Sequence, residues 1–225
     1  MALGIWNLTQ IKAKTRALSG RLDTNDLSDA DLTAYINRYY QGVFCYEVQP
    51  LELETYFSFN TVDGTEEYNL RTQTDLTTSE IFQDGFINLM APITCDGYEM
   101  ELFISADLFY NKWPDVVTYS EARPIDVLFY NQKLLFRYIP DDAYVVKFGA
   151  FKIPAAFANS SPATEYPILE EWGPLISYGA AIEVVEDFGA FEIAERLMPM
   201  YERHKNKIIR RTHIQLSEQR SIPKF

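Results

Sequence analysis

The sequence predicts an α+β protein: helices from both ends of the chain form one helical bundle, and an antiparallel β domain is inserted between them. Apolar residues recur at helical spacing near both ends. In the middle, aromatic and β-branched residues alternate with polar ones, and turn sequences separate the alternating runs. We expect bundle helix pairs over residues 1–46 and 161–211, the β domain over 47–160, and an extended C-terminal arm over 212–225.

The composition indicates one large globular domain, or a domain that carries an insertion. Of the 225 residues, 47% are hydrophobic and 15% aromatic, which is enough to bury a sizeable core. No apolar run approaches the roughly 20 residues of a membrane-spanning helix, and the first residues lack the pattern of a secretion signal. We therefore expect a protein of the reducing cytosol, in which Cys45 and Cys95 are buried thiols.

Two helices are predicted before residue 46. In the first, apolar residues recur every three or four positions from Leu8 to Leu18, and Gly20 ends the helix. The second begins at Ser28, which resembles a capping box together with Asp31. Its residues that we expect in the bundle core are Tyr35, Ile36 and Tyr39.

The predicted β domain contains four apparent hairpin turns and one helix. Asp-Gly between alternating hydrophobic residues is the strongest short-range signal for a hairpin. The run SADLFYNKWPD predicts a short helix that Pro114 ends. The four predicted turns are Asp63-Gly64, Asp96-Gly97, Asn131-Gln132 and Asp141-Asp142.

Helical periodicity returns after a loop that ends near residue 167. Small residues from Gly179 to Ala181 would let another helix approach closely, and a last helix follows from Phe191 to Ile208. Pro199 falls inside this last pattern, so we expect a kink or a break near residues 195–199. The bundle-core residues predicted in this part are Trp172, Ile176, Ile193 and Leu197.

Charge is distributed unevenly along a chain whose net charge is −12. Residues 1–22 carry +4 and residues 203–225 carry +6, whereas residues 23–202 carry −22. A basic last turn is common at the end of a helix, but Arg220 and Lys224 lie beyond any expected helix end. We interpret the basic tail as a surface that docks onto an acidic partner, including the acidic body of another copy.

Sequence motifs of catalysis and metal binding are missing. The chain has two histidines, His204 and His213, and both lie in the basic C-terminal stretch. The segment ISYG lacks the glycine of a nucleophile elbow, and no nucleotide-binding loop or zinc-ligand spacing is present. Pairs of glutamates could serve a glycosidase, but nothing singles out two of them. We therefore expect no enzyme, no cofactor and no metal.

Two binding functions compete with a structural role. A nucleic-acid binder could use the basic tail, although the charge of −22 over residues 23–202 would repel a polyanion. The aromatic content of the β domain would also suit a carbohydrate-binding module. A soluble polyanion- or carbohydrate-binding module therefore remains the alternative.

Three stretches together resemble a known family. They are LTQIKAKTRALSGRLDTNDLSDADLTAYINRYYQGVF, RPIDVLFYNQKLLFRYIPDDAYVVKFGAFKIPAAF and YPILEEWGPLISYGAAIEVVEDFGAFEIAERLMPMYERHKNKIIRR. In their order they are similar to the head-to-tail adaptor (connector, head-completion) proteins of tailed bacteriophages. The stretch between residues 71 and 120 has no detailed counterpart in that pattern.

The resemblance implies a structural virion protein, assembled in the host cytoplasm and located at the head–tail interface. Such adaptors form a ring below the portal, most often of twelve copies. The ring lengthens the DNA channel, lets DNA pass without specific binding, and docks the tail or nozzle. The resemblance also implies that the C-terminal arm embraces neighbouring copies or the portal. The contact residues that we predict are Lys205, Arg210, Arg211, Arg220, Ile222, Lys224 and Phe225.

Overall fold

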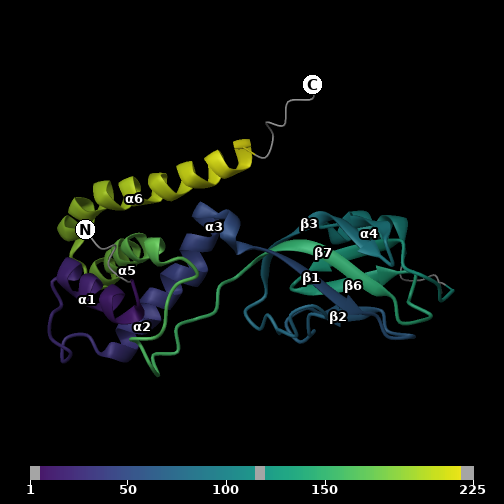
Figure 1. The fold of residues 1–225 in the computed structure, drawn as a ribbon, viewed down its shortest axis with the longest axis horizontal. Helices are drawn as coiled ribbons and strands as arrows, with labels where there is room; N and C mark the ends of the chain where they lie inside the picture. The colour runs from purple at the N-terminus through teal and green to yellow at the C-terminus, as the bar shows by residue number, and fades with distance from the viewer. Residues whose placement is uncertain (1–5, 115–119, 219–225) are drawn as a thin grey trace. The chain divides into compact units, whose positions relative to one another are not determined.

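The computed structural model in Figure 1 describes residues 6–114 and 120–218, with side chains described as far as residue 212. The chain divides into two compact units. We call Met1–Glu52 with Pro154–Phe225 the helical unit, and Leu53–Ile153 the β unit. The predicted mixed α+β class is confirmed. None of the described helices is long and apolar enough to cross a membrane.

The helical unit takes helices from both of its chain segments. A π-helical stretch, Arg38–Phe44, continues directly from α2, and a 3₁₀ turn, Glu170–Trp172, precedes α5. The α-helices are α1 (Leu8–Ser19), α2 (Asp29–Asn37), α3 (Cys45–Val48), α5 (Gly173–Asp187) and α6 (Phe191–Glu218).

Local sequence explains where the first two helices begin and end. The Asn7 side chain accepts a hydrogen bond from the Gln10 N–H at 3.0 Å, and the Ser28 hydroxyl accepts one from the Asp31 N–H at 3.1 Å. Each bond satisfies a donor that has no partner inside its helix. Gly20 ends α1 with a φ of 73°, a conformation that suits glycine.

An aromatic cluster forms the centre of the helical unit. Trp172, Tyr40 and Phe44 are almost completely buried. The ring centroids of Phe44 and Trp172 lie 5.0 Å apart, and those of Tyr40 and Phe157 lie 5.3 Å apart. These contacts join the chain before the β unit to the chain after it.

Helix α6 departs from two predictions. The predicted break near residues 195–199 does not occur, because the helix continues through Pro199. Pro199 is exposed together with Glu195, so water can solvate the carbonyl that lacks a helical donor. The predicted extended arm was also wrong for residues 212–218, because α6 reaches Glu218. No Gly or Pro follows Pro199 until Pro223, so the sequence has no signal that would stop the helix earlier. Residues 219–225 lie outside the described residues.

The β unit is a curled seven-stranded sheet with the order β1-β7-β3-β4-β5-β6-β2. Helix α4 (Ala106–Lys112) forms near its predicted position. The strands are β1 (Glu54–Asn60), β2 (Glu67–Asn69), β3 (Phe86–Cys95), β4 (Tyr98–Phe103), β5 (Asp126–Tyr130), β6 (Lys133–Arg137) and β7 (Val145–Lys152).

We had predicted an entirely antiparallel sheet, but one pair of neighbouring strands is parallel. Strands β4 and β5 pair in parallel, with Leu102 opposite Val127. The connection between them contains α4, and parallel neighbours require a long crossover of this kind. The helix predicted in this segment was therefore also an indication that the strands on either side of it pair in parallel.

Two of the four predicted hairpins are confirmed. Asp96-Gly97 joins β3 to β4, and Asn131-Gln132 joins β5 to β6. The hairpins at Asp63-Gly64 and Asp141-Asp142 were wrong, because β1 pairs with β7 and β2 pairs with β6.

Strands β1 and β2 lie at opposite ends of the strand order, yet they share one core. The ring centroids of Phe59 in β1 and Tyr68 in β2 lie 5.3 Å apart. The curl of the sheet brings its two ends together over Phe57, Phe86 and Phe148, which fill the centre.

Candidate interaction surfaces

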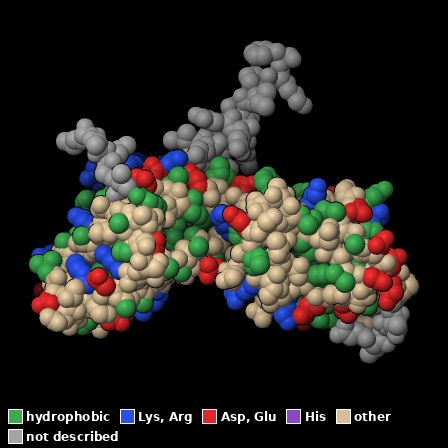
Figure 2. Space-filling view, turned by 60° about the horizontal axis from the view of Figure 1, so that its bottom comes forward, with side chains coloured by type: hydrophobic (Ala, Val, Ile, Leu, Met, Phe, Trp, Pro, Cys, Tyr) green, Lys and Arg blue, Asp and Glu red, His purple; other side chains and the backbone are tan. Residues whose placement is uncertain are grey.

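The two units differ in charge. The β unit holds 16 acidic and seven basic residues, a net charge of −9, whereas the helical unit holds 16 acidic and 13 basic residues, a net charge of −3. Figure 2 shows acidic side chains gathered on the β unit, at the right of the view. Interactions with other charged molecules will therefore differ between the two units.

A patch of cations lies on the helical unit, and we call it the basic face. It consists of Lys14 on α1 and Arg203, Lys207 and Arg210 on α6. The three α6 residues are spaced by four and three positions, so they share one side of the helix, and all three are exposed. Within the described part of the chain, none of the four forms an ion pair. Their positive charge is therefore available to a partner.

The pKa of His204 reflects the positive charge of the basic face. Its ring stacks on Tyr178, with centroids 5.3 Å apart, and the Lys14 ammonium lies 5.8 Å from the same tyrosine ring. Burial lowers the pKa of His204, and the positive charges of Lys207, Arg203 and Lys14 lower it further. The lowered pKa favours the neutral imidazole, so His204 adds little to the positive charge that the surrounding cations supply.

Not all predicted contact residues belong to this face. Lys205 donates to Glu47 at 2.7 Å, and Arg211 pairs with Glu171 and, at 3.3 Å, with Glu52. These two cations thus contact carboxylates of their own unit, whereas Arg210 is exposed and unpaired within the described residues. The remaining predicted contacts, Arg220, Ile222, Lys224 and Phe225, lie outside the described residues.

The predicted bundle-core residues lie in the helical unit, with two departures. Ile36, Tyr39, Trp172, Ile176 and Leu197 are buried. Tyr35 is only half-buried, and its ring packs at the surface against the exposed Arg38, with the guanidinium carbon 4.7 Å from the ring centroid. Ile193 is also half-buried, and the adjacent Ala194 takes the buried position.

A chain of hydrogen bonds from the interior to the surface was missed in the sequence. The Tyr39 hydroxyl donates to Tyr201 at 3.4 Å, and the Tyr201 hydroxyl donates to Glu47 at 2.9 Å. Tyr201 and Lys205 are four residues apart on α6, which could have indicated a shared partner. The partner itself, Glu47, is more than 150 residues away and was not predictable.

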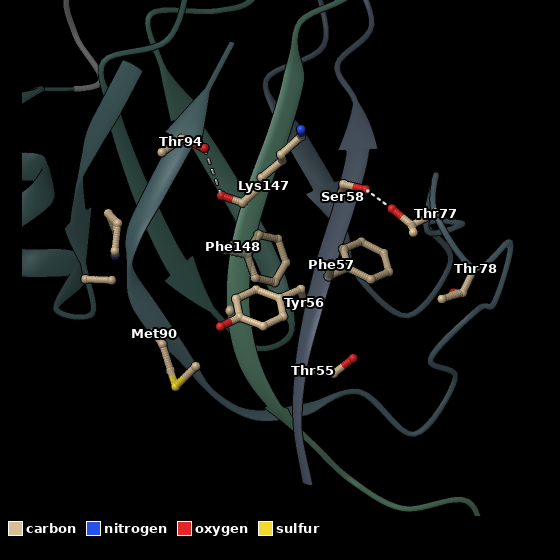
Figure 3. Close-up of a pocket in the computed structure, with 13 residues that line it drawn as sticks. Thr55, Tyr56, Phe57, Ser58, Thr77, Thr78, Met90, Thr94, Lys147 and Phe148 are labelled. Carbon is tan, nitrogen blue, oxygen red and sulfur yellow. Dashed lines mark hydrogen bonds between the residues drawn. The ribbon is translucent and has the colours of Figure 1, made fainter. Parts of the chain in front are cut away.

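The β unit carries a groove that no motif had indicated, with a volume of about 600 Å³. Figure 3 shows residues of β1, β3 and β7 around it. Tyr56, Gly149 and Met90 lie side by side across the three strands, and Tyr56 is 77% exposed. An added Cβ at Gly149 would lie 2.6 Å from the Met90 Cε, so the Met90 side chain packs over this glycine and leaves no room for a side chain at position 149.

The loop after β2 covers one end of β1 beside this groove. The Ser58 N–H donates to the Asp75 carboxylate at 2.8 Å, and the Leu76 N–H donates to the Ser58 carbonyl at 2.9 Å. Asp75 also accepts from the Thr78 N–H at 2.7 Å. Burial alone would raise the pKa of Asp75, but these hydrogen bonds outweigh it and hold the pKa below its usual range.

Neither a protein-family model nor a curated protein matches this sequence. Across residues 6–114 and 120–218, no cluster of three or more His, Cys, Asp or Glu side chains is placed to hold a metal ion. The basic face and the groove are the two surfaces that we consider for function.

Proposed function

We propose that this chain is a structural virion protein that forms a ring below the portal, extends the DNA channel and docks the tail or nozzle. The observation that carries the proposal is the basic face, a group of unpaired cations on a chain of net charge −12. Opposite charges on two partners accelerate their encounter and fix their orientation. An acidic protein with a cationic surface can thus bind its neighbours in one orientation, each time through that surface.

In this proposal the helical unit forms a bundle that builds the wall of the ring, with the β unit inserted into it. Each copy presents its basic face to an acidic surface of the portal or of the next copy. Such a contact joins two different surfaces, and it closes into a ring when the rotation between copies permits. We propose twelve copies, as the sequence resemblance implies.

The strongly acidic part of the chain supports a channel for DNA. Residues 23–202 carry a net charge of −22. A channel lined with like charge would not hold the duplex during ejection. DNA then passes through the ring without specific binding, and the head–tail interface of the virion is the site of action.

Electron microscopy of the protein mixed with a portal protein tests the proposal. We expect a ring at one end of the portal, and Arg210→Glu should sharply reduce the ring-bearing fraction. The matched control is Arg71→Glu, which reverses an exposed arginine of the β unit that forms no ion pair in the described residues. Portals without an added ring at saturating protein would contradict the proposal.

A polyanion-binding function is the second candidate, and the same basic face favours it. Titration with a fluorescent DNA duplex distinguishes the two functions. Strong binding that weakens steeply with salt and depends on Arg203 and Lys207, without any ring on the portal, would support the polyanion binder instead.

A further inference from the structure

We propose that the groove on the β unit receives residues 219–225 of a neighbouring copy, which pair as an added strand with the open edge of β1. This inference rests on the proposed function, because it requires copies that lie side by side. It names the contact that the C-terminal segment makes in the assembly. The argument begins with the main chain of β1.

The edge of β1 has main-chain groups without partners. In an antiparallel strand, the N–H and C=O groups of alternate residues point to the same side. Those of Ser58 bind Asp75 and Leu76 and therefore point away from β7. Those of Tyr56 and Glu54 must then point the same way, and within the described residues no hydrogen bond reaches them. This part of β1 can pair with another extended segment.

The chain itself occupies the adjoining part of the same edge. Leu76 lies beside Ser58 where the next strand of the sheet would be. The loop then turns away at Thr77 and Thr78, both of which line the groove. The loop therefore pairs with β1 at Ser58 but not at Tyr56 and Glu54. These two residues leave room for a short additional strand.

The groove offers apolar surface to an incoming side chain at Tyr56 and Met90, which both line it. Figure 3 shows both side chains, and Tyr56, at 77% exposed, lies on the face of the sheet opposite to the core residue Phe148. The segment 219–225 supplies two such side chains, Ile222 and Phe225. Seven extended residues reach about 23 Å. This length allows the segment to pair with the two open residues and still place one apolar side chain against Tyr56.

Charge favours the same occupant. The segment contains Arg220 and Lys224 and no acidic residue, whereas the β unit has a net charge of −9. Glu54 on the open edge and Glu80 at the end of the loop form no ion pair within the described residues. Glu54 is adjacent in sequence to Thr55, and Glu80 follows two residues after Thr78; since Thr55 and Thr78 line the groove, these two carboxylates are the proposed partners of the two cations.

A labelled peptide of residues 214–225 tests the site by fluorescence anisotropy with the isolated full chain. We expect saturable binding that Tyr56→Pro weakens by roughly tenfold beyond the effect of Tyr56→Ala. Proline removes the open N–H, and since this group points away from β7, the substitution leaves the sheet bonds intact. Tyr98→Ala, which removes a 60% exposed tyrosine outside the groove, should change nothing. Equal affinities for Tyr56→Pro and Tyr56→Ala would overturn the strand pairing.

Disulfide trapping tests the contact between copies of the full chain. Variants with Phe225→Cys and Thr77→Cys are mixed under mild oxidation, and the native Cys45 and Cys95 do not compete because both are buried. We expect a mixed dimer, and none when Tyr98→Cys replaces Thr77→Cys. Failure of both the peptide and the trapping overturns this inference without touching the proposed function, which is tested separately on the portal.

Discussion

Replacing Gly179 by alanine should destabilise the helical unit, although alanine is the better helix former. Gly179 lies in α5 with the ring of Tyr39 directly against its Cα. An added Cβ would lie within 2.5 Å of three ring atoms, closer than the 3.0 Å below which real Cβ atoms essentially never approach. The ring cannot easily withdraw, because Tyr39 is buried and packs edge-on against Tyr201 at 6.1 Å.

The expected magnitude is the difference between two effects. Overpacking of a close-packed core typically costs about 1–3 kcal/mol, occasionally more, whereas replacing glycine by alanine inside a helix returns up to about 1 kcal/mol. Because three ring atoms overlap the added Cβ, the cost lies at the upper end, about 2–3 kcal/mol, and we expect a net loss of about 1–2 kcal/mol in the free energy of unfolding. For a chain of this size, each kcal/mol lowers Tm by about 2–4 °C.

Thermal unfolding followed by circular dichroism measures this loss. Gly42→Ala is the matched control, because an added Cβ there meets nothing within 4 Å and the glycine lies in a helical segment. It should leave Tm unchanged or raise it slightly. In a Tyr39→Ala background, Gly179→Ala should cost much less, which a double-mutant cycle detects. If Gly179→Ala is neutral in both backgrounds, the proposed packing of Tyr39 on α5 is incorrect.

Three further predictions concern stability and assembly. Trp172→Ala should cost about 3–5 kcal/mol in chemical unfolding, because Trp172 is fully buried against Phe44; a cost below 1 kcal/mol would contradict this. Asp75→Asn should destabilise the β unit at pH 7, and the deficit relative to the native chain should vanish as pH falls below about 3.8, because the lowered pKa of Asp75 gives stability that is lost on protonation. By light scattering the isolated protein should be mainly monomeric, because its acidic body repels other copies at low salt; a stable ring without the portal would refute this.

Features set by neighbouring residues were predictable from the sequence. The cap at Ser28 formed as expected, and so did the hairpins at Asp96-Gly97 and Asn131-Gln132. In each case two to four adjacent residues determine the geometry. Asp63-Gly64 carries the same local signal, yet it joins strands that pair elsewhere. A turn sequence specifies a change of direction, but the partners of the flanking strands depend on the whole sheet.

The candidate surfaces, too, were predictable from the sequence only in part. The charge count indicated a cationic surface near the C-terminus, and Arg203, Lys207 and Arg210 form one. It could not show that Lys205 and Arg211 are paired within their own unit, because their carboxylate partners are distant in sequence. Only the folded chain separates cations that stabilise the unit from cations that are available to a partner.

The groove on the β unit shows why a docking surface can lack any sequence motif. Tyr56, Met90 and Gly149 are separated by more than 30 residues in each case, and only the register of β1, β7 and β3 brings them together. The open edge of β1 depends on a second register, that of Leu76 against Ser58. If the same face is to accept another copy, selection must act on both registers at once. Substitutions that shift either register should therefore impair assembly even where the β unit remains folded, because they displace the main-chain groups that the incoming segment would bind.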